Sequence, residues 1–258
     1  MAFPDVFVEL MDEKVPGLEQ YRWMVAARTR DFDTAANALV RNAKDPSKSL
    51  DQVETSLSLS KLMDHAKCIC DGTTTERSVL IEKNRERVML QRKYFENKRA
   101  LTAKELLNSC LRMIDEEENR LGDEETLDMF FDSLAVCTTF LSDEEVADAA
   151  LLVWFKAIAK DRTQWMGWVR HENDLTDAVL LDRVRTTTLF GKLVEKTLEV
   201  QEWETVCHFD TIYTFAKEKW DRVKELDTEM FGSNSMIRLL SLVSSANTLA
   251  ARNMDMEE

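Results

Sequence analysis

Three side chains that can bind a metal, His65, Cys68 and Cys70, lie close together in the sequence. Imidazole nitrogens and thiolate sulfurs are the usual ligands of zinc in proteins. Offsets of three and five along one helix, however, turn Cys70 away from His65, because successive helical residues are about 100° apart. We therefore expect no metal site at this position, and we expect the chain to need no cofactor.

The residue pairs that could support catalysis are incomplete. Cys207 and His208 are adjacent, so a helix would point them apart, whereas a thiol nucleophile needs its base within hydrogen-bond reach. His171 and Glu172 lack the second histidine of a zinc-protease helix, and the sequence contains no glycine-rich phosphate loop or nucleophile elbow. The sequence predicts a protein that is not an enzyme.

Two acidic runs, 115–118 and 143–145, could bind a cation. The second run lies at an expected helix start, where carboxylates interact favourably with the positive end of the helix dipole. An all-helical metalloenzyme that combines these runs with His65 or His171 remains an alternative. Stoichiometric metal in the purified protein would support that alternative.

The composition indicates long helices joined by short turns. Only 6 Gly and 3 Pro occur in 258 residues, while 44% of residues are hydrophobic and 32% are charged. The net charge of -14 disfavours binding to nucleic acid or to an anionic membrane. The stretch 76–104 is an exception, with nine Lys or Arg against four Glu, and either forms a solvated helix face or attracts an acidic partner.

No run of about 18 apolar residues occurs, and the first 20 residues contain five acidic side chains, among them Asp5, Glu9, Asp12 and Glu13, where a signal peptide would be apolar. We therefore expect a cytosolic or nuclear protein whose five cysteines are reduced.

Apolar residues recur with helical periodicity in most windows. The sequence predicts an all-α fold, an irregular α-helical stack of solenoid-like antiparallel hairpins over residues 1–252, with a possible N-terminal sub-block 1–71 and a disordered acidic tail at 253–258. The helices that we expect cover 5–14, 18–29, 33–43, 50–70, 76–98, 103–119, 124–140, 143–161, 176–199 with a possible break near 185–187, 211–228 and 235–252.

The expected helix 50–70 is apolar on two sides. Leu50, Val53 and Leu57 form one stripe. A second, nearly opposite stripe consists of Leu59, Leu62, Met63, Ala66 and Ile69. Either this helix is sandwiched between neighbours in its own chain, or the second stripe binds another protein. Trp165 and Trp168, which flank Gly167 beyond an expected helix end, offer a second candidate anchor for a partner.

Several segments together resemble one known family. They are the run 54–62, preceded by Trp23 and 32–39, and then 114–120, 156–161 with Trp165, and 188–193. Their types and order are similar to the C-terminal α-helical domain of the Y-complex scaffold nucleoporin 133 family. The chain departs from that family because it lacks the N-terminal β-propeller with its membrane-sensing loop, and because the region after Val200 matches poorly.

The resemblance implies a structural scaffold of the nuclear pore complex, located at the nuclear envelope, that supports pore assembly and nucleocytoplasmic transport. It implies a helical interface with a neighbouring Y-complex nucleoporin of the nucleoporin 107 type, and neither a small-molecule ligand nor direct membrane binding is expected. The expected partner-binding residues are Leu57, Leu59, Leu62, Met63 and Ala66. Another helical-repeat adaptor, such as a vesicle-coat subunit, is the alternative within the same class.

Overall fold

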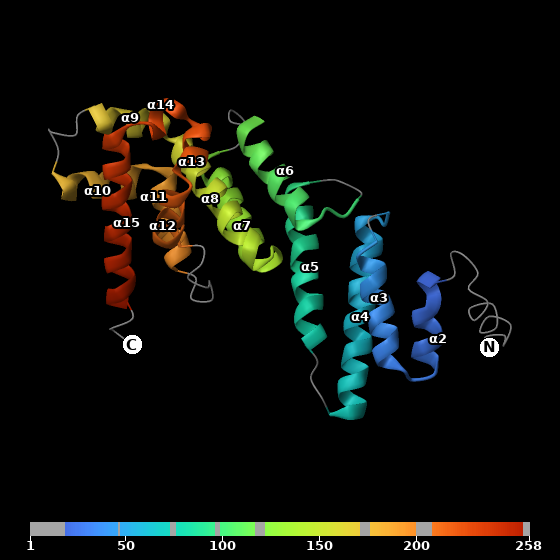
Figure 1. Ribbon diagram of the computed structural model, residues 1–258. Helices are drawn as coiled ribbons and strands as arrows, with labels where there is room; N and C mark the ends of the chain where they lie inside the picture. The colour runs from blue at the N-terminus through green and yellow to red at the C-terminus, as the bar shows by residue number, and fades with distance from the viewer. Residues whose placement is uncertain are drawn as a thin grey trace. The chain divides into compact units, whose positions relative to one another are not determined.

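The computed structural model describes residues 19–45, 47–72, 76–95, 99–116, 122–170, 176–199 and 208–254. Over these residues the chain forms one short 3-10 helix and fourteen α-helices that pack against one another, with no β-strand (Figure 1). This confirms the predicted all-α helical stack. The chain divides into two compact units, Met1–Thr102 and Ala103–Glu258, and each has its own hydrophobic interior.

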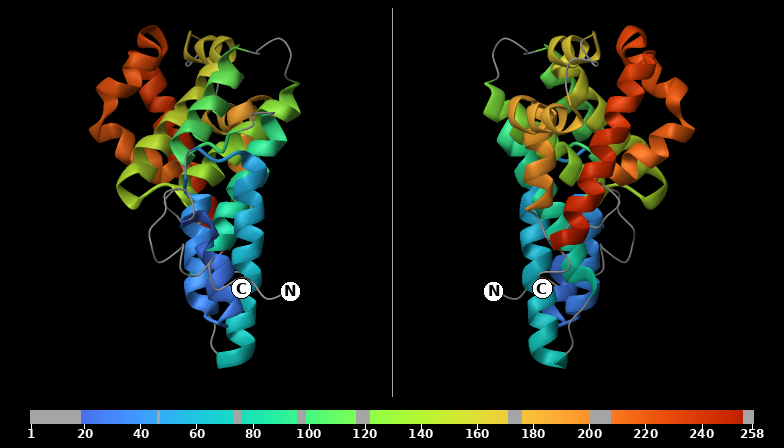
Figure 2. Two further views of the ribbon diagram at one scale, coloured as in Figure 1. Left: turned by 90° about the vertical axis from the view of Figure 1, so that its right-hand side faces the viewer. Right: turned by 90° about the vertical axis from the view of Figure 1, so that its left-hand side faces the viewer.

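The N-terminal unit consists of helices that pack in the order of the sequence. α3 contacts both α2 and α4, and α4 also contacts α5. Figure 2 shows α3 (blue) and α4 (cyan) side by side from two directions. The elements are η1 (Glu19–Tyr21), α2 (Arg22–Arg28), α3 (Phe32–Ala43), α4 (Leu50–Asp71) and α5 (Glu76–Tyr94).

Helix α4 has well-defined ends. Ser49 and Gln52 form a reciprocal capping box that satisfies two free N–H groups at its start. At its end, Gly72 adopts a φ of +67°, which costs least for glycine, and its N–H donates to the carbonyl of Cys68 at 2.8 Å. The 22-residue helix between these caps is the longest in the unit.

The C-terminal unit is larger and contains more helices. α15 packs along α9, α10, α12 and α14, and Figure 2 shows it (red) beside the orange helices from a second direction. The elements are α6 (Ala103–Glu116), α7 (Asp123–Phe140), α8 (Asp143–Lys160), α9 (Arg162–Arg170), α10 (Asp177–Thr187), α11 (Leu189–Leu198), α12 (Phe209–Glu218), α13 (Trp220–Leu226), α14 (Thr228–Phe231) and α15 (Asn234–Met254).

Aromatic rings fill the centre of this unit. Phe190 contacts Trp154 and Trp165 edge to face, with ring centroids 5.6 and 5.7 Å apart, and Phe209 lies 4.7 Å from Phe190. Such edge-to-face pairs add to the free energy gained by burying the rings. The cluster is completed by Phe155, Tyr213, Trp220 and Phe231.

Several sequence predictions need correction. Trp165 lies inside α9, which the sequence analysis did not predict, and it is fully buried, so it is not an exposed anchor; Trp168 is half-buried. The helix expected at 211–228 is interrupted at Lys219. Asn253 and Met254, assigned to the acidic tail, continue α15. The predicted helix 5–14 and the tail residues 255–258 lie outside the described residues.

The boundary of the N-terminal unit also differs from the predicted sub-block 1–71. The compact unit continues to Thr102. The physical reason is that α5 contributes Ile81 and Val88 to the same core as Val53 and Leu57 of α4. α5 therefore belongs with α3 and α4.

Candidate functional site

The two apolar stripes of α4 have different surroundings. Leu50, Val53 and Leu57 face the interior, where each is at most 6% exposed and packs with residues of α3 and α5. On the opposite stripe Leu62 is 59% exposed and Ile69 is 85% exposed. The first stripe is therefore the core face of the helix, and the second faces solvent over much of its length.

The second stripe is completed by side chains of intermediate exposure. Leu59, Met63 and Ala66 are each half-buried. We call Leu59, Leu62, Met63, Ala66 and Ile69 the outer face of α4. Leu57, which the sequence analysis included among the partner-binding residues, is 1% exposed and belongs to the core. The structure thus brings four of the five predicted partner-binding residues to one surface and places Leu57 on the opposite side.

Charged residues of α4 are directed to the neighbouring helices. Lys61 pairs with Glu82 of α5, and Lys67 pairs with Asp33 of α3 at 2.6 Å. Near the start of the helix, Glu54 pairs with Arg92 of α5, also at 2.6 Å. Lysine and glutamate side chains that would otherwise extend into solvent are therefore held at the flanks of α4.

The outer face of α4 also lacks charged side chains. At 100° per residue, no Asp, Glu, Lys or Arg between Gln52 and Cys70 falls on the half of α4 that runs from His65 through Leu62 to Ser56. The other residues on this half are the polar residues Thr55, Ser56, Ser58 and His65. In a chain with 32% charged residues, a strip without Asp, Glu, Lys or Arg that exposes Leu62 and Ile69 stands out from an ordinary solvated helix face.

A partly buried ionic cluster fixes the C-terminal half of α4. Arg77 of α5 donates to Asp33 of α3 at 2.6 Å and lies 3.5 Å from Asp64, which is almost fully buried. Hydrogen bonds from Arg77 and Lys67 lower the pKa of Asp33 to about 2. Ser60 adds a buried hydrogen bond, donated to the carbonyl of Ala36 at 3.1 Å. These contacts orient α4 so that its outer face points away from both neighbours.

The residues first considered for metal or thiol chemistry do not converge. His65 and Cys70 are exposed and Cys68 is half-buried, and no group of three or more His, Cys, Asp or Glu within the described ranges is arranged to hold a metal ion. Burial raises the pKa of the Cys110 thiol to about 12, which keeps it protonated. His171 and Cys207 lie outside the described residues.

Sequence reasoning found the outer face but not the ionic contacts that border it. The charged residues of α4 are spaced like those of an ordinary solvated helix, and their partners Asp33, Arg77 and Arg92 lie on other elements. The signal visible in the sequence was the second apolar stripe, which consists of Leu59, Leu62, Met63, Ala66 and Ile69.

No helix in the described part of the chain combines the length and the apolar content needed to cross a bilayer. No protein-family model matches the chain, and no curated protein matches it.

Proposed function

We propose that this protein is a structural scaffold component of the nuclear pore Y-complex. In this proposal the outer face of α4 binds a neighbouring nucleoporin of the nucleoporin 107 type. The observation that carries the proposal is the uncharged strip with its exposed Leu62 and Ile69. The resemblance of several segments to the nucleoporin 133 family supplies the identity of the complex.

The energetics of the outer face suit a helix-on-helix contact. Burying an exposed leucine or isoleucine side chain completely contributes about 1.5–3 kcal/mol. Leu62 and Ile69 are two turns apart on the same side of α4, with the small residue Ala66 between them. Small and large side chains alternating along a helix allow the side chains of a second helix to interdigitate.

The decisive experiment measures binding of the full chain to the C-terminal region of the nucleoporin 107-type protein from the same organism. Isothermal titration calorimetry on Leu62→Asp and Ile69→Asp should show affinity reduced at least tenfold, because each variant buries a carboxylate in an apolar contact. Both side chains are exposed, so the helical circular dichroism signal should be unchanged.

A matched control is Met89→Asp, which places the same charge on α5 at a side chain that is 65% exposed. This variant should bind like the wild type. Undiminished binding by both α4 variants, or no binding by the wild type, would refute the proposal. Specific capture of vesicle-coat subunits that depends on Leu62 would instead favour the alternative of another helical-repeat adaptor.

A further inference from the structure

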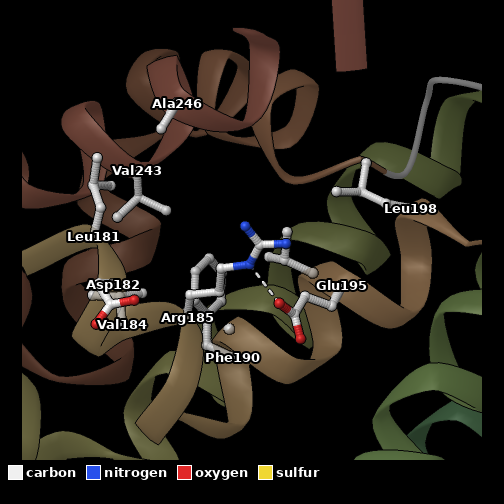
Figure 3. A pocket seen from close by; sticks show the side chains of 11 residues that line it. Leu181, Asp182, Val184, Arg185, Phe190, Glu195, Leu198, Val243 and Ala246 are labelled. Carbon is white, nitrogen blue, oxygen red and sulfur yellow. Dashed lines mark hydrogen bonds and ion pairs between the residues drawn. The ribbon is translucent and has the colours of Figure 1, made fainter. Parts of the chain in front are cut away.

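A pocket lies in the C-terminal unit, between α10, α11 and α15 (Figure 3). Its volume is about 340 Å³, within the range of pockets that bind ligands. Phe190 and Val184 form its buried floor, and Val243 of α15 lines one wall. Leu181 stands beside Val243, and Figure 3 shows Leu198 on the other side. Apolar side chains therefore form the buried base of the pocket, and polar groups contribute a substantial share of its lining.

The helices around this pocket are held in place by contacts beneath it. The Thr188 hydroxyl accepts a hydrogen bond from the Gly191 N–H at 2.8 Å and donates to the carbonyl of Val184 at 2.5 Å. Asp161 accepts a hydrogen bond from the Leu189 N–H at 2.6 Å. The corner between α10 and α11 is thus fixed by hydrogen bonds, and the pocket is pre-formed, which lowers the entropic cost of filling it.

Charged groups are confined to the rim. Arg185 donates through Nε to Glu195, and the two side chains point toward each other in Figure 3. Asp182 also lies on the rim, and no ion pair to it is found within the described residues. Because Arg185 neutralises only one of the two carboxylates, the rim carries a net negative charge.

The arrangement distinguishes a protein partner from a free small molecule. Sites for small molecules place their few polar groups inside the cavity, where they fix the orientation of the ligand. Here the polar groups are solvent-accessible, with the Arg185 side chain 68% exposed, and they surround an apolar centre. An apolar centre with a polar rim is the anatomy of a protein interface.

We propose that this pocket receives a bulky apolar side chain, such as leucine, from a partner protein, with a lysine or arginine beside it in the partner's sequence. The apolar side chain fills the space above Phe190, and the basic residue pairs with Asp182 at the rim. This site is separate from the outer face of α4, and it does not depend on the function proposed above.

The test uses two synthetic peptides that differ in one residue, acetyl-Gly-Ser-Leu-Lys-Ser-Gly-amide and its counterpart with Glu in place of Lys. Amide shifts of Gly191, Val194 and Val243 in the full ¹⁵N-labelled chain report binding. The lysine peptide should saturate with a dissociation constant of about 1 mM, as expected for one anchoring side chain. The glutamate peptide should bind at least fivefold more weakly.

Two variants locate the site. Ala246→Phe fills the pocket from α15 and should weaken binding of the lysine peptide at least tenfold, whereas Ala178→Phe adds the same ring at an exposed position of α10 and should have no effect. Asp182→Asn should retain binding but lose the preference for lysine. Wild-type amide dispersion outside the pocket in each variant verifies its fold.

Three outcomes would overturn the proposal. They are no saturable shifts with the lysine peptide, equal binding of the glutamate peptide, and unchanged binding by Ala246→Phe. A separate test uses n-hexylamine alone, which has an apolar chain and a cation but no peptide backbone. If it binds as tightly as the lysine peptide, the pocket is a small-molecule site and the protein occupant is wrong.

Discussion

Asp33 links three helices through its carboxylate, because it accepts hydrogen bonds from Lys67 of α4 and Arg77 of α5 while belonging to α3. The Arg77 and Lys67 hydrogen bonds lower its pKa to about 2, below the ordinary 3.8. The folded chain therefore holds this carboxylate ionised at a pH where the unfolded chain protonates it. The resulting stabilisation is complete above about pH 4 and is lost as the pH falls through about 2.

Replacing Asp33 by Asn should remove this pH-dependent stabilisation. At pH 7 we expect the variant to melt about 4 °C below the wild type, a modest effect because the Asp33 side chain is 44% exposed. The difference in melting temperature should narrow between pH 4 and pH 2. Thermal circular dichroism of both proteins at several pH values measures this difference. A difference that stays constant from pH 4 to pH 2 would show that the Asp33 charge does not contribute to stability through Lys67 and Arg77.

At the scale of single residues, helical periodicity predicted which stripe of α4 contains Leu62, and the structure places that residue on an exposed strip. Periodicity placed Leu57 and Leu59 on different stripes but could not tell which stripe faces the core, because two apolar stripes on one helix look alike in the sequence. Leu57 was included among the partner-binding residues because of the family resemblance, and the structure places it in the core. The first stripe of α4, which contains Leu57, is the core face because Ile81 and Val88 of α5 pack in the same hydrophobic cluster.

At the scale of elements, the start of most described helices was predictable because caps and apolar periodicity are local signals. The helix expected from residue 143 is α8, which begins at Asp143, and the Ser142 N–H before it donates to the Glu145 carboxylate at 3.4 Å. Helix α9 was missed because Gly167 and the adjacent tryptophans suggested a chain leaving a helix. The structure instead keeps this segment helical and buries Trp165 against Phe190, a contact that local sequence does not encode.

The crossing of α10 and α11 depends on the missing side chain of Gly191. A Cβ built at this position would lie 2.2 Å from the carbonyl oxygen of Val184 and 2.7 Å from the Cα of Arg185. Because both neighbours are backbone atoms, they cannot move aside without separating the two helices. Glycine at this position therefore permits a close approach between two helices.

Gly191→Ala should lower the free energy of unfolding by about 2–3 kcal/mol, the cost of overpacking at a fixed contact. Gly167→Ala in α9 is the matched control. No atom outside its own helix backbone lies within 4 Å of the added Cβ, so alanine should stabilise the helix by about 0.5–1 kcal/mol. Urea unfolding of the wild type and both variants measures these changes. If Gly191→Ala is as stable as Gly167→Ala, the backbone beside Val184 accommodates the added methyl group without cost, and the prediction is wrong.

At the scale of the whole molecule, the chain has two cores of different composition. The core shared by α3, α4 and α5 is aliphatic and is built from Val40, Ala43, Leu50, Val53, Leu57, Ile81 and Val88. The core of the C-terminal unit contains interlocking rings such as Trp154, Phe190 and Phe209. Aromatic side chains bury more area each, so the second core contributes more free energy per residue.

Because each unit buries its own apolar residues, we expect each to fold when expressed alone, as Met1–Thr102 and as Ala103–Glu258. Far-UV circular dichroism should show two helical proteins with cooperative thermal transitions. The smaller unit should melt at the lower temperature, because a shorter chain buries a smaller fraction of its surface. If either fragment is unfolded or melts without cooperativity while the full-length chain is folded, the prediction is wrong. That unit would then need the other unit for its stability.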